Sequence, residues 1–176
     1  LNDLSSSEQY NTAGMFSKMG LAANRAVGGK EAFILERDEE SNSWKLVYSS
    51  TNQPVDVTCI NGDNTIQRSW RSKTPLWLHQ ETRMTEADRC LLQMADAVTL
   101  MIAPIIPSSS AGAMLLVFLP SASLFPGEDL ELVSLLAKQG AMFLENSRLV
   151  GQLQRYSEGL EQRVEERSAA LRDSER

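Results

Sequence analysis

The spacing of apolar residues divides the first third of the chain into a helix and a hairpin. Apolar positions recur at helical spacing after a capping signal formed by Ser5 and Glu8, and Gly28 marks the end of that pattern. Two short runs rich in β-forming residues then flank the polar stretch 38–43. This arrangement predicts an amphipathic opening helix followed by a β-hairpin.

The middle of the chain predicts shorter elements. Residues 55–59 alternate between apolar and polar, as on a strand. Residues 74–80 also resemble a short strand, with Trp77 and His79 on one face and Leu76 and Leu78 on the other. Between these two segments Asn64 is placed to cap a short helix, and Thr85 with Asp88 is placed to cap another. We therefore expect a strand, a short helix, a second strand and a third helix in this order.

The most apolar segments come late and predict the centre of the sheet. Residues 97–107 and 111–120 are too continuously apolar to face solvent on either side. Pro104 lacks a backbone donor, which predicts a bulge or irregular pairing there. From Gly127 onward no strong stop signal appears, so one helix is expected to run to the end. The fold class expected is α+β: an antiparallel sheet of about five to six strands flanked by helices, with a long C-terminal coiled-coil helix.

The last part of this helix carries a narrow apolar seam. The seam residues are Leu149, Leu153, Tyr156, Leu160, Val164 and Leu171. Steps of three and four are typical of a coiled coil, and two consecutive steps of four between Leu153 and Val164 form a stutter that loosens pairing near Leu160. We predict a parallel homodimer, in which Phe16 and Met19 of the opening helix add to the same bundle.

A lone helix, folded back on its domain or left in solvent, is the alternative. Such a helix is only marginally stable without packing. Like charges also repel at i,i+4 between Arg163 and Arg167 and between Glu161 and Glu165. Both observations favour contacts with a partner chain.

Charge and composition narrow the possible partners. The chain has 17 Lys and Arg against 23 Asp and Glu, a net charge of −6, which argues against nucleic acid or an anionic membrane. No stretch is apolar enough to span a bilayer, and no cleavable signal precedes the first helix. Two cysteines do not make a disulfide framework, so reduced thiols and a cytoplasmic location are expected. The chain begins at Leu1 and stops within a helical pattern, which we interpret as a piece of a longer protein.

The order of elements, together with the start of the last helix, resembles the GAF family of sensory domains. A central Pro in the strand at 100–106 and Gly112 at the opening of the next strand also resemble this family. The residues that match the family's closing helix are Phe125, Glu128, Asp129, Leu130, Leu132, Leu135, Leu136, Leu144, Glu145, Asn146, Arg148 and Leu149.

This resemblance implies a division of the chain and a function. Residues 1–11 would form a helical lead-in, 12–148 a GAF-like sensory domain, and 149–176 a signalling helix like those that join GAF domains to histidine kinase, PAS or diguanylate cyclase modules. The implied function is a regulatory module of a multidomain signal-transduction protein, without enzymatic activity in this part, that transmits a signal to a C-terminal output domain.

The resemblance also implies a ligand pocket in the middle of the chain. The candidate pocket residues are Trp70, Trp77, His79, Arg83 and Met94. Trp and Met suit adaptable apolar binding of an unknown small molecule, although they can equally be plain core. The first alternative function is therefore a sensor of a small molecule or of a haem-like cofactor.

Other chemistry receives less support from the residues. His79 is the single histidine and carries no haem motif. Cys90 resembles the cysteine that anchors a bilin in phytochrome-like relatives, but Leu91 stands where a His commonly follows. Cys59 and Cys90 could form a redox pair, as in a GAF-type enzyme acting on a small sulfoxide, or be inert apolar residues, which we favour. No catalytic set or metal cluster is apparent, so no cofactor and no metal are predicted.

Overall fold

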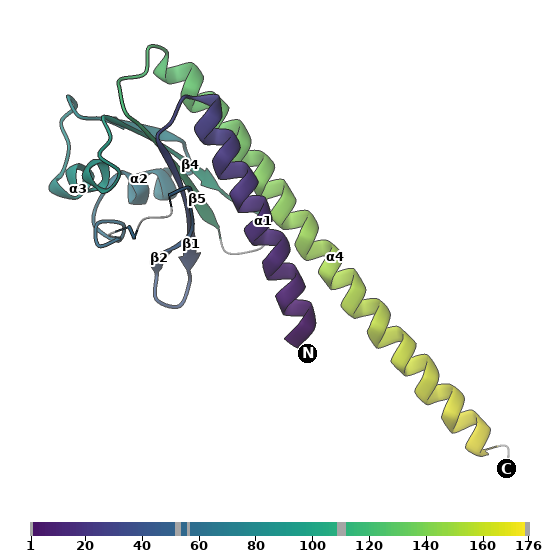
Figure 1. The fold of residues 1–176 in the computed structure, drawn as a ribbon. Helices are drawn as coiled ribbons and strands as arrows, with labels where there is room; N and C mark the ends of the chain where they lie inside the picture. The colour runs from purple at the N-terminus through teal and green to yellow at the C-terminus, as the bar shows by residue number, and fades with distance from the viewer. Residues whose placement is uncertain (1, 52–53, 56, 109–111, 175–176) are drawn as a thin grey trace.

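The computed structural model describes residues 2–51, 54–55, 57–108 and 112–174, with the backbone alone for 2–11 and 169–174. A five-stranded antiparallel sheet has helices on both faces (Figure 1). Its strand order is β2-β1-β5-β4-β3. The elements are α1 (Asn2–Ala26), β1 (Glu31–Asp38), β2 (Ser43–Ser49), α2 (Thr65–Ser72), β3 (Leu76–His79), α3 (Glu86–Met94), β4 (Thr99–Ile105), β5 (Ala113–Leu119) and α4 (Pro126–Ser174).

The sheet separates two hydrophobic cores. Every residue of β5 is buried, and its side chains alternate between the two faces because successive residues of a strand point to opposite sides. Met114, Leu116 and Phe118 join the core under α2 and α3. Leu115 and Val117 join the core under α1 and α4. This confirms the late apolar runs as the centre of the sheet.

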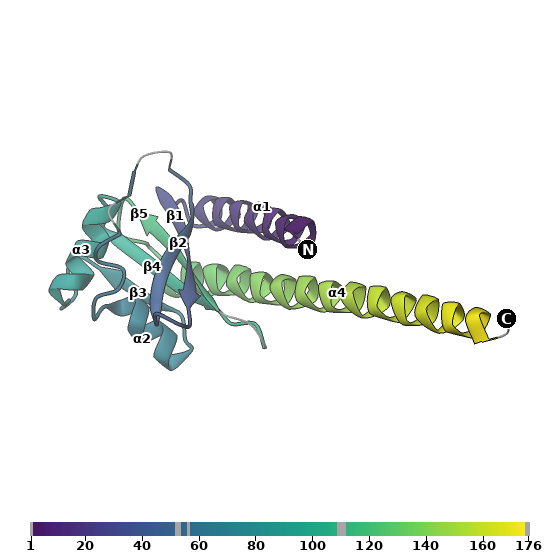
Figure 2. The same ribbon diagram turned by 90° about the horizontal axis from the view of Figure 1, so that it is seen from below.

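Helices α1 and α4 lie side by side on the second face and extend from the same end of the domain (Figures 1 and 2). Phe16 and Met19 are only 4% and 7% exposed, and they pack against the protein's own strands. The structure therefore moves these two residues from the expected dimer interface to the core. Gly140 of α4 lies directly against Met19, so a larger residue there would require the Met19 side chain to move.

Two local expectations are wrong, namely the strand at 55–59 and the bulge at Pro104. Residues 57–62 form turns instead of continuing a strand from 55. The reason lies in the buried Asn64, whose Nδ2 donates to the carbonyl oxygens of Cys59 (2.8 Å) and Ile60 (3.0 Å) and holds the chain in a turn before α2. Its Oδ1 accepts from the N–H of Gln67, which confirms the predicted cap.

Pro104 produces no bulge. The register between β4 and β5 continues through the pair Pro104 and Met114 without a shift. Pairing of β4 with β3 ends at Ile102, so the proline lies where β4 has become an edge strand. Edge positions tolerate proline because no neighbouring strand needs the missing donor.

The terminal helices are continuous. Helix α1 is unbroken from Asn2, so no break in the helix marks the expected division at residues 11 and 12. Helix α4 has 49 residues, which at 1.5 Å per residue gives a length of roughly 74 Å. Across the residues that the structure describes, no helix is both long and apolar enough to cross a membrane.

Cys59 and Cys90 form a disulfide, which corrects the expectation of two reduced, inert thiols. Their Cα atoms are 5.9 Å apart, within the usual range for a disulfide. The bond links the turn before α2 to the middle of α3 across a sequence separation of 31. Spacing could not predict this pair because the contact is set by tertiary packing.

A buried carboxylate joins the same two helices. Asp88 is fully buried and accepts from the N–H (2.6 Å) and hydroxyl (2.7 Å) of Thr65, at the start of α2, and from Arg68 (3.1 Å). With Thr85 it also forms the capping box of α3, as predicted. Burial raises the pKa of Asp88, but the hydrogen bonds from Thr65, Thr85 and Arg68 outweigh this and hold the pKa below its usual value.

Reduction of the disulfide should lower the free energy of unfolding by about 3 to 4 kcal/mol, because opening a loop of this length returns conformational entropy to the unfolded chain. Urea unfolding with and without tris(2-carboxyethyl)phosphine measures the change. The control variant, Cys59→Ala with Cys90→Ala, should show the lower stability in both conditions. An unfolding midpoint that stays fixed while both thiols become alkylated would contradict this prediction.

Asp88→Asn should destabilise the protein at neutral pH by roughly 1.5 to 3 kcal/mol, since hydrogen bonds to a buried charge are lost. Because the folded pKa is depressed, this stabilisation is fully present above the ordinary value of 3.8 and disappears as the pH falls through the lower folded pKa. The free energies of unfolding of the two proteins, measured with urea between neutral and acidic pH, should therefore become equal in acid.

The matched control is Asp96→Asn, because the Asp96 side chain is 99% exposed in its ion pair with Lys30. Exposed ion pairs contribute little to stability, so the free energy of unfolding of this variant should stay close to that of the parent at every pH. If the difference in the free energy of unfolding between Asp88→Asn and the parent grew as the pH fell, the predicted sign of the pH dependence would be wrong.

Candidate functional site

The structure separates the predicted pocket residues. Trp70 and Met94 pack against the core under α2 and α3. Trp77 lies on the opposite side of β3 from the buried Leu78, and its side chain is 42% exposed. Arg83 is exposed in the segment between β3 and α3. Trp77 and His79 lie together, with ring centroids 6.4 Å apart, but away from Trp70 and Met94 in the core.

Trp70 is held in a packed cluster of aromatic and cationic side chains. Its ring meets Trp44 edge to face, with ring centroids 5.2 Å apart. The Arg37 guanidinium carbon lies 4.9 Å from the Trp44 ring centroid, and the Lys73 Nζ lies 3.4 Å from the Trp70 ring centroid. Desolvation, together with the nearby Arg37 charge, lowers the pKa of Lys73. Gly112 lies so close to Trp70 that a Cβ would collide with the ring. This packing gives Trp70 a structural role.

His79 does not have the hydrogen bonding of a haem ligand. Its Nδ1 accepts from the backbone N–H of Glu81 at 3.2 Å, so the proton of the neutral ring belongs on Nε2. A histidine that binds a metal through one nitrogen normally donates a hydrogen bond from the other. Here Nδ1 is an acceptor, the reverse of what ligation through Nε2 requires. Within the part of the chain that the structure describes, no group of His, Cys, Asp and Glu could hold a metal ion.

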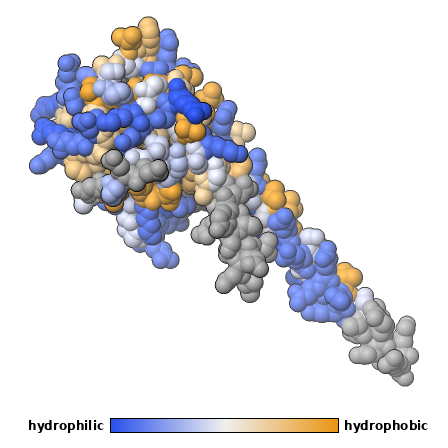
Figure 3. Space-filling view, viewed as in Figure 1, coloured by the Kyte–Doolittle hydropathy of each residue, from blue (hydrophilic) through white to orange (hydrophobic). Residues whose placement is uncertain are grey.

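The exposed face of α4 provides the clearest candidate site. Leu149, Leu153, Tyr156, Leu160 and Val164, here called the C-terminal seam, are 44% to 72% exposed on a single helix. Hydrophobic side chains reach the surface at intervals along the helix as it leaves the domain (Figure 3). The side chain of Leu171, the last predicted seam residue, lies outside the described residues.

Exposed apolar residues also occur on α4 before the C-terminal seam. Leu132, Leu135 and Met142 are 44%, 52% and 67% exposed although they lie beside the domain. The seam predicted from the sequence begins at Leu149 and does not include them. The signal that could have found them is the same spacing of three and four continued toward the N-terminal end of the helix.

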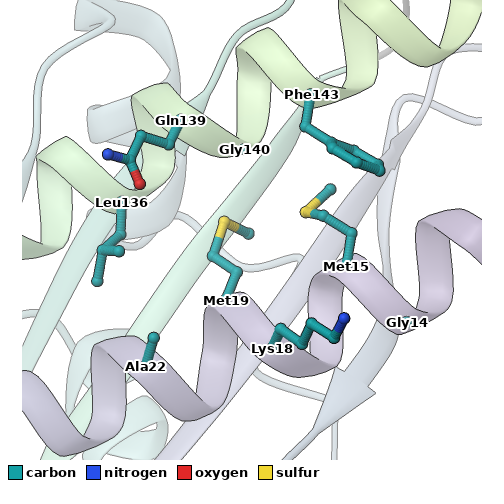
Figure 4. Close-up of a pocket in the computed structure, with 9 residues that line it drawn as sticks. All are labelled: Gly14, Met15, Lys18, Met19, Ala22, Leu136, Gln139, Gly140 and Phe143. Atoms are coloured by element: carbon teal, nitrogen blue, oxygen red, sulfur yellow. The ribbon is translucent and has the colours of Figure 1, made fainter.

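A cavity of about 460 Å³ opens between α1 and α4. The thioether sulfurs of Met15 and Met19 and the ring of Phe143 point toward this space (Figure 4). Its lining residues are Gly14, Met15, Lys18, Met19, Ala22, Leu136, Gln139, Gly140 and Phe143. The cavity is thus an apolar groove beside the exposed face of α4.

Comparison with known proteins identifies the fold. No family model matches the sequence, and no curated protein matches it. Among solved structures, the blue-light absorbing form of the PixJ GAF domain from Thermosynechococcus elongatus is similar, with a TM-score of 0.70, 14% identity, and coverage of 85% of this chain and 94% of that one.

Two domains of sensor histidine kinases are similar as well. The GAF domain of a two-component sensor histidine kinase from Bacillus halodurans has a TM-score of 0.60 and 15% identity, covering 78% of this chain and 95% of its own. A domain of a putative two-component sensor histidine kinase from Sinorhizobium meliloti 1021 has a TM-score of 0.57 and 13% identity, covering 76% and 90%. The chain therefore has the fold of a GAF domain, extended by one long C-terminal helix.

Proposed function

We propose that this chain is a regulatory GAF module that pairs in parallel with a second copy through the C-terminal seam and passes a signal along α4 to an output domain. The single observation that carries the proposal is the seam itself: five exposed apolar residues on one face of a helix that leaves its domain. Such a patch on a long, otherwise charged helix is typical of an interaction surface.

The free energy gained by burying the seam, compared with the cost of association, favours pairing of two copies. Full burial of one such side chain contributes about 1.5 to 3 kcal/mol. Association costs about 4 to 15 kcal/mol, and two copies supply ten seam side chains, so even partial burial can offset that cost. The alternative of an unpaired, solvated helix leaves this apolar surface exposed with no gain.

The proteins to which two of the similar domains belong suggest the kind of output. Both domains come from two-component sensor histidine kinases, so we propose a histidine kinase or a related signalling module as the domain that α4 serves. A shift between two packings of the paired helices would carry the signal, with the stutter near Leu160 as the weakest point. A cytoplasmic location remains a prediction from composition.

We do not extend light absorption from PixJ to this chain. In this structure the sulfur of Cys90, the residue that resembles a chromophore-anchoring cysteine, is bonded to Cys59. His79 is equally unsuited to a haem because of its hydrogen bonding. A small-molecule signal at the packed face of the sheet therefore has less support than pairing through α4.

The disulfide favours a second candidate, a redox input. In cytosolic proteins disulfides are usually catalytic or redox-sensing. Cys90 is partly exposed on α3, so a dithiol can attack the bond. Two electrons and two protons from that dithiol would leave two thiols here and a disulfide in the dithiol. Reduction would release α3 from the turn before α2, while Asp88 still joins α3 to the start of α2.

Leu153→Glu with Leu160→Glu should convert a dimer to a monomer, because two charges on each copy would enter the seam. Size-exclusion chromatography with light scattering gives the mass, and circular dichroism checks the fold. Gln154→Glu with Gln162→Glu adds the same charge at exposed positions outside the seam and should remain dimeric. A parent protein that is strictly monomeric at high micromolar concentration would sink the proposal.

Equilibration in dithiol redox buffers tests the second candidate. A redox input should have a midpoint potential near that of the cellular thiol pool, roughly −220 to −300 mV, whereas a purely structural disulfide lies below about −300 mV. Thiol alkylation followed by mass spectrometry reports the reduced fraction at each potential. A midpoint well below that of the pool would rule out the redox input and leave pairing through α4 untouched.

A further inference from the structure

The cavity between α1 and α4 is a groove with a buried floor and an open mouth. Its floor is formed by Met19, which is only 7% exposed, and by the buried Gly140. Met15, Leu136 and Phe143 are half-buried and form its walls. At about 460 Å³ the groove lies within the usual size range of small-molecule sites. It is therefore large enough to hold a ligand.

Small residues explain why the two helices leave this space unfilled. Gly14 and Gly140 have no side chain, and Ala22 has a single methyl group. A Cβ built at Gly14 would meet no atom within 4 Å. The lining residues of α1 extend from Gly14 to Ala22, which at 1.5 Å per residue gives a groove about 12 Å long. The groove is therefore elongated along the helices, which suits a chain-like ligand.

The walls of the groove favour an alkyl chain. The thioether groups of Met15 and Met19 and the ring of Phe143 point into the space (Figure 4). Methionine side chains are flexible and polarizable, so they adapt to apolar ligands of irregular shape. Apart from Lys18 and Gln139, the described lining residues have apolar side chains or none. An alkyl chain in the groove would therefore leave no buried polar side chain without a partner.

Lys18 gives the groove a positive charge at its exposed edge. Of the nine described residues that line the groove, it alone is charged, and its side chain extends along α1 at the edge of the space (Figure 4). Among the side chains that the structure describes, no carboxylate forms an ion pair with Lys18. A lysine can lay its methylene groups on apolar surface and keep its ammonium group in water. The charge of Lys18 is therefore available to an anionic group at the mouth of the groove.

We propose that the groove between α1 and α4 binds a free straight-chain carboxylate of medium length, with its alkyl chain on Met15, Met19 and Phe143 and its carboxylate beside Lys18. All described lining residues belong to one chain, so the proposal goes beyond the pairing of two copies and does not depend on it. The alkyl chain would touch both helices next to the contact of Met19 with Gly140. Binding would therefore hold α1 against α4.

Methionine methyl NMR of the full chain, titrated with sodium decanoate below its critical micelle concentration, tests the place of binding. Met15 and Met19 line the groove, whereas Met94 and Met114 lie in the core on the other side of the sheet. With ¹³C-labelled methyl groups, we expect saturable shifts of the Met15 and Met19 signals and unchanged signals from Met94 and Met114. Saturable shifts confined to Met94 and Met114 would place the ligand on the other face of the sheet and overturn the proposal.

A reversal of charge tests the class of ligand. Lys18→Glu should weaken binding of decanoate and strengthen binding of decyltrimethylammonium, each by about two- to fivefold, because an exposed ion pair is weak. Isothermal titration calorimetry measures both dissociation constants. Lys138→Glu is the matched control, since Lys138 is exposed on α4 but does not line the groove, and it should change neither constant. Unchanged affinity of Lys18→Glu for both ligands would overturn the choice of a carboxylate.

Filling the groove tests the position of the alkyl chain. Gly14→Leu with Ala22→Leu should weaken decanoate binding by roughly tenfold, because the two leucines take the place of about two buried methylene groups, each of which contributes about fourfold in affinity. Leucine favours a helix more than glycine does, so α1 should stay folded, which circular dichroism checks. Ala13→Leu with Ala26→Leu adds leucines at exposed positions of α1 outside the groove and should bind like the parent. Equal affinity of the filled variant and the parent would overturn the proposal.

The seam variant, Leu153→Glu with Leu160→Glu, separates this inference from the proposed function. Equal binding of decanoate to the parent and to the seam variant would support the groove as a ligand site, whatever their masses. Binding to the seam variant alone would show that a second copy covers the groove in the parent, which would overturn the proposal. Absence of binding to both proteins would also overturn it and would leave pairing through the C-terminal seam untouched.

Discussion

Packing of α4 on the sheet is the interaction on which the rest of the structure depends. Val133 and Ala137 close the core that also holds Phe16 of α1 and the central strand β5. The same helix then leaves the domain as a single element of 49 residues. Since the helix is continuous, the face that α4 buries in the domain determines which face it presents outside. The orientation of the exposed apolar residues is therefore a consequence of core packing.

Local rules predicted much of the fold. Asn64 and the pair Thr85 and Asp88 cap the helices that the sequence assigned to them. These signals act within a few residues and do not depend on the rest of the chain. The strand expected at 55–59 was wrong because the side chain of Asn64 donates to the carbonyl oxygens of Cys59 and Ile60, at the end of that segment. The hydrogen bonds of the buried Asn64 side chain therefore outweigh the strand tendency of a short alternating pattern.

Long-range features were harder to predict. The contact between Cys59 and Cys90 exists because α3 packs beside the turn before α2, and no spacing rule encodes it. Phe16 and Met19 have the helical spacing of an interface residue, yet spacing alone cannot distinguish the protein's own sheet from a second copy. On α4 the inner and outer apolar faces overlap in one leucine-rich stretch, which hid Leu132 and Leu135 until burial separated them. Trp77 and His79 share one face of β3, whereas Leu78 on the other face packs in the core that holds Trp70 and Met94, so the candidate pocket residues lie apart.

Both terminal helices extend from the same end of the domain, and α1 runs back along α4 (Figure 2). Any domain joined ahead of α1 would therefore sit beside the outgoing helix, not at the far side of the sheet. A mechanical input at the N-terminal end would reach α4 through the contact of Met19 with Gly140, without crossing the sheet. In such an arrangement α1 and α4 would form the direct connection. The sheet with α2 and α3 would lie beside that connection and modulate it.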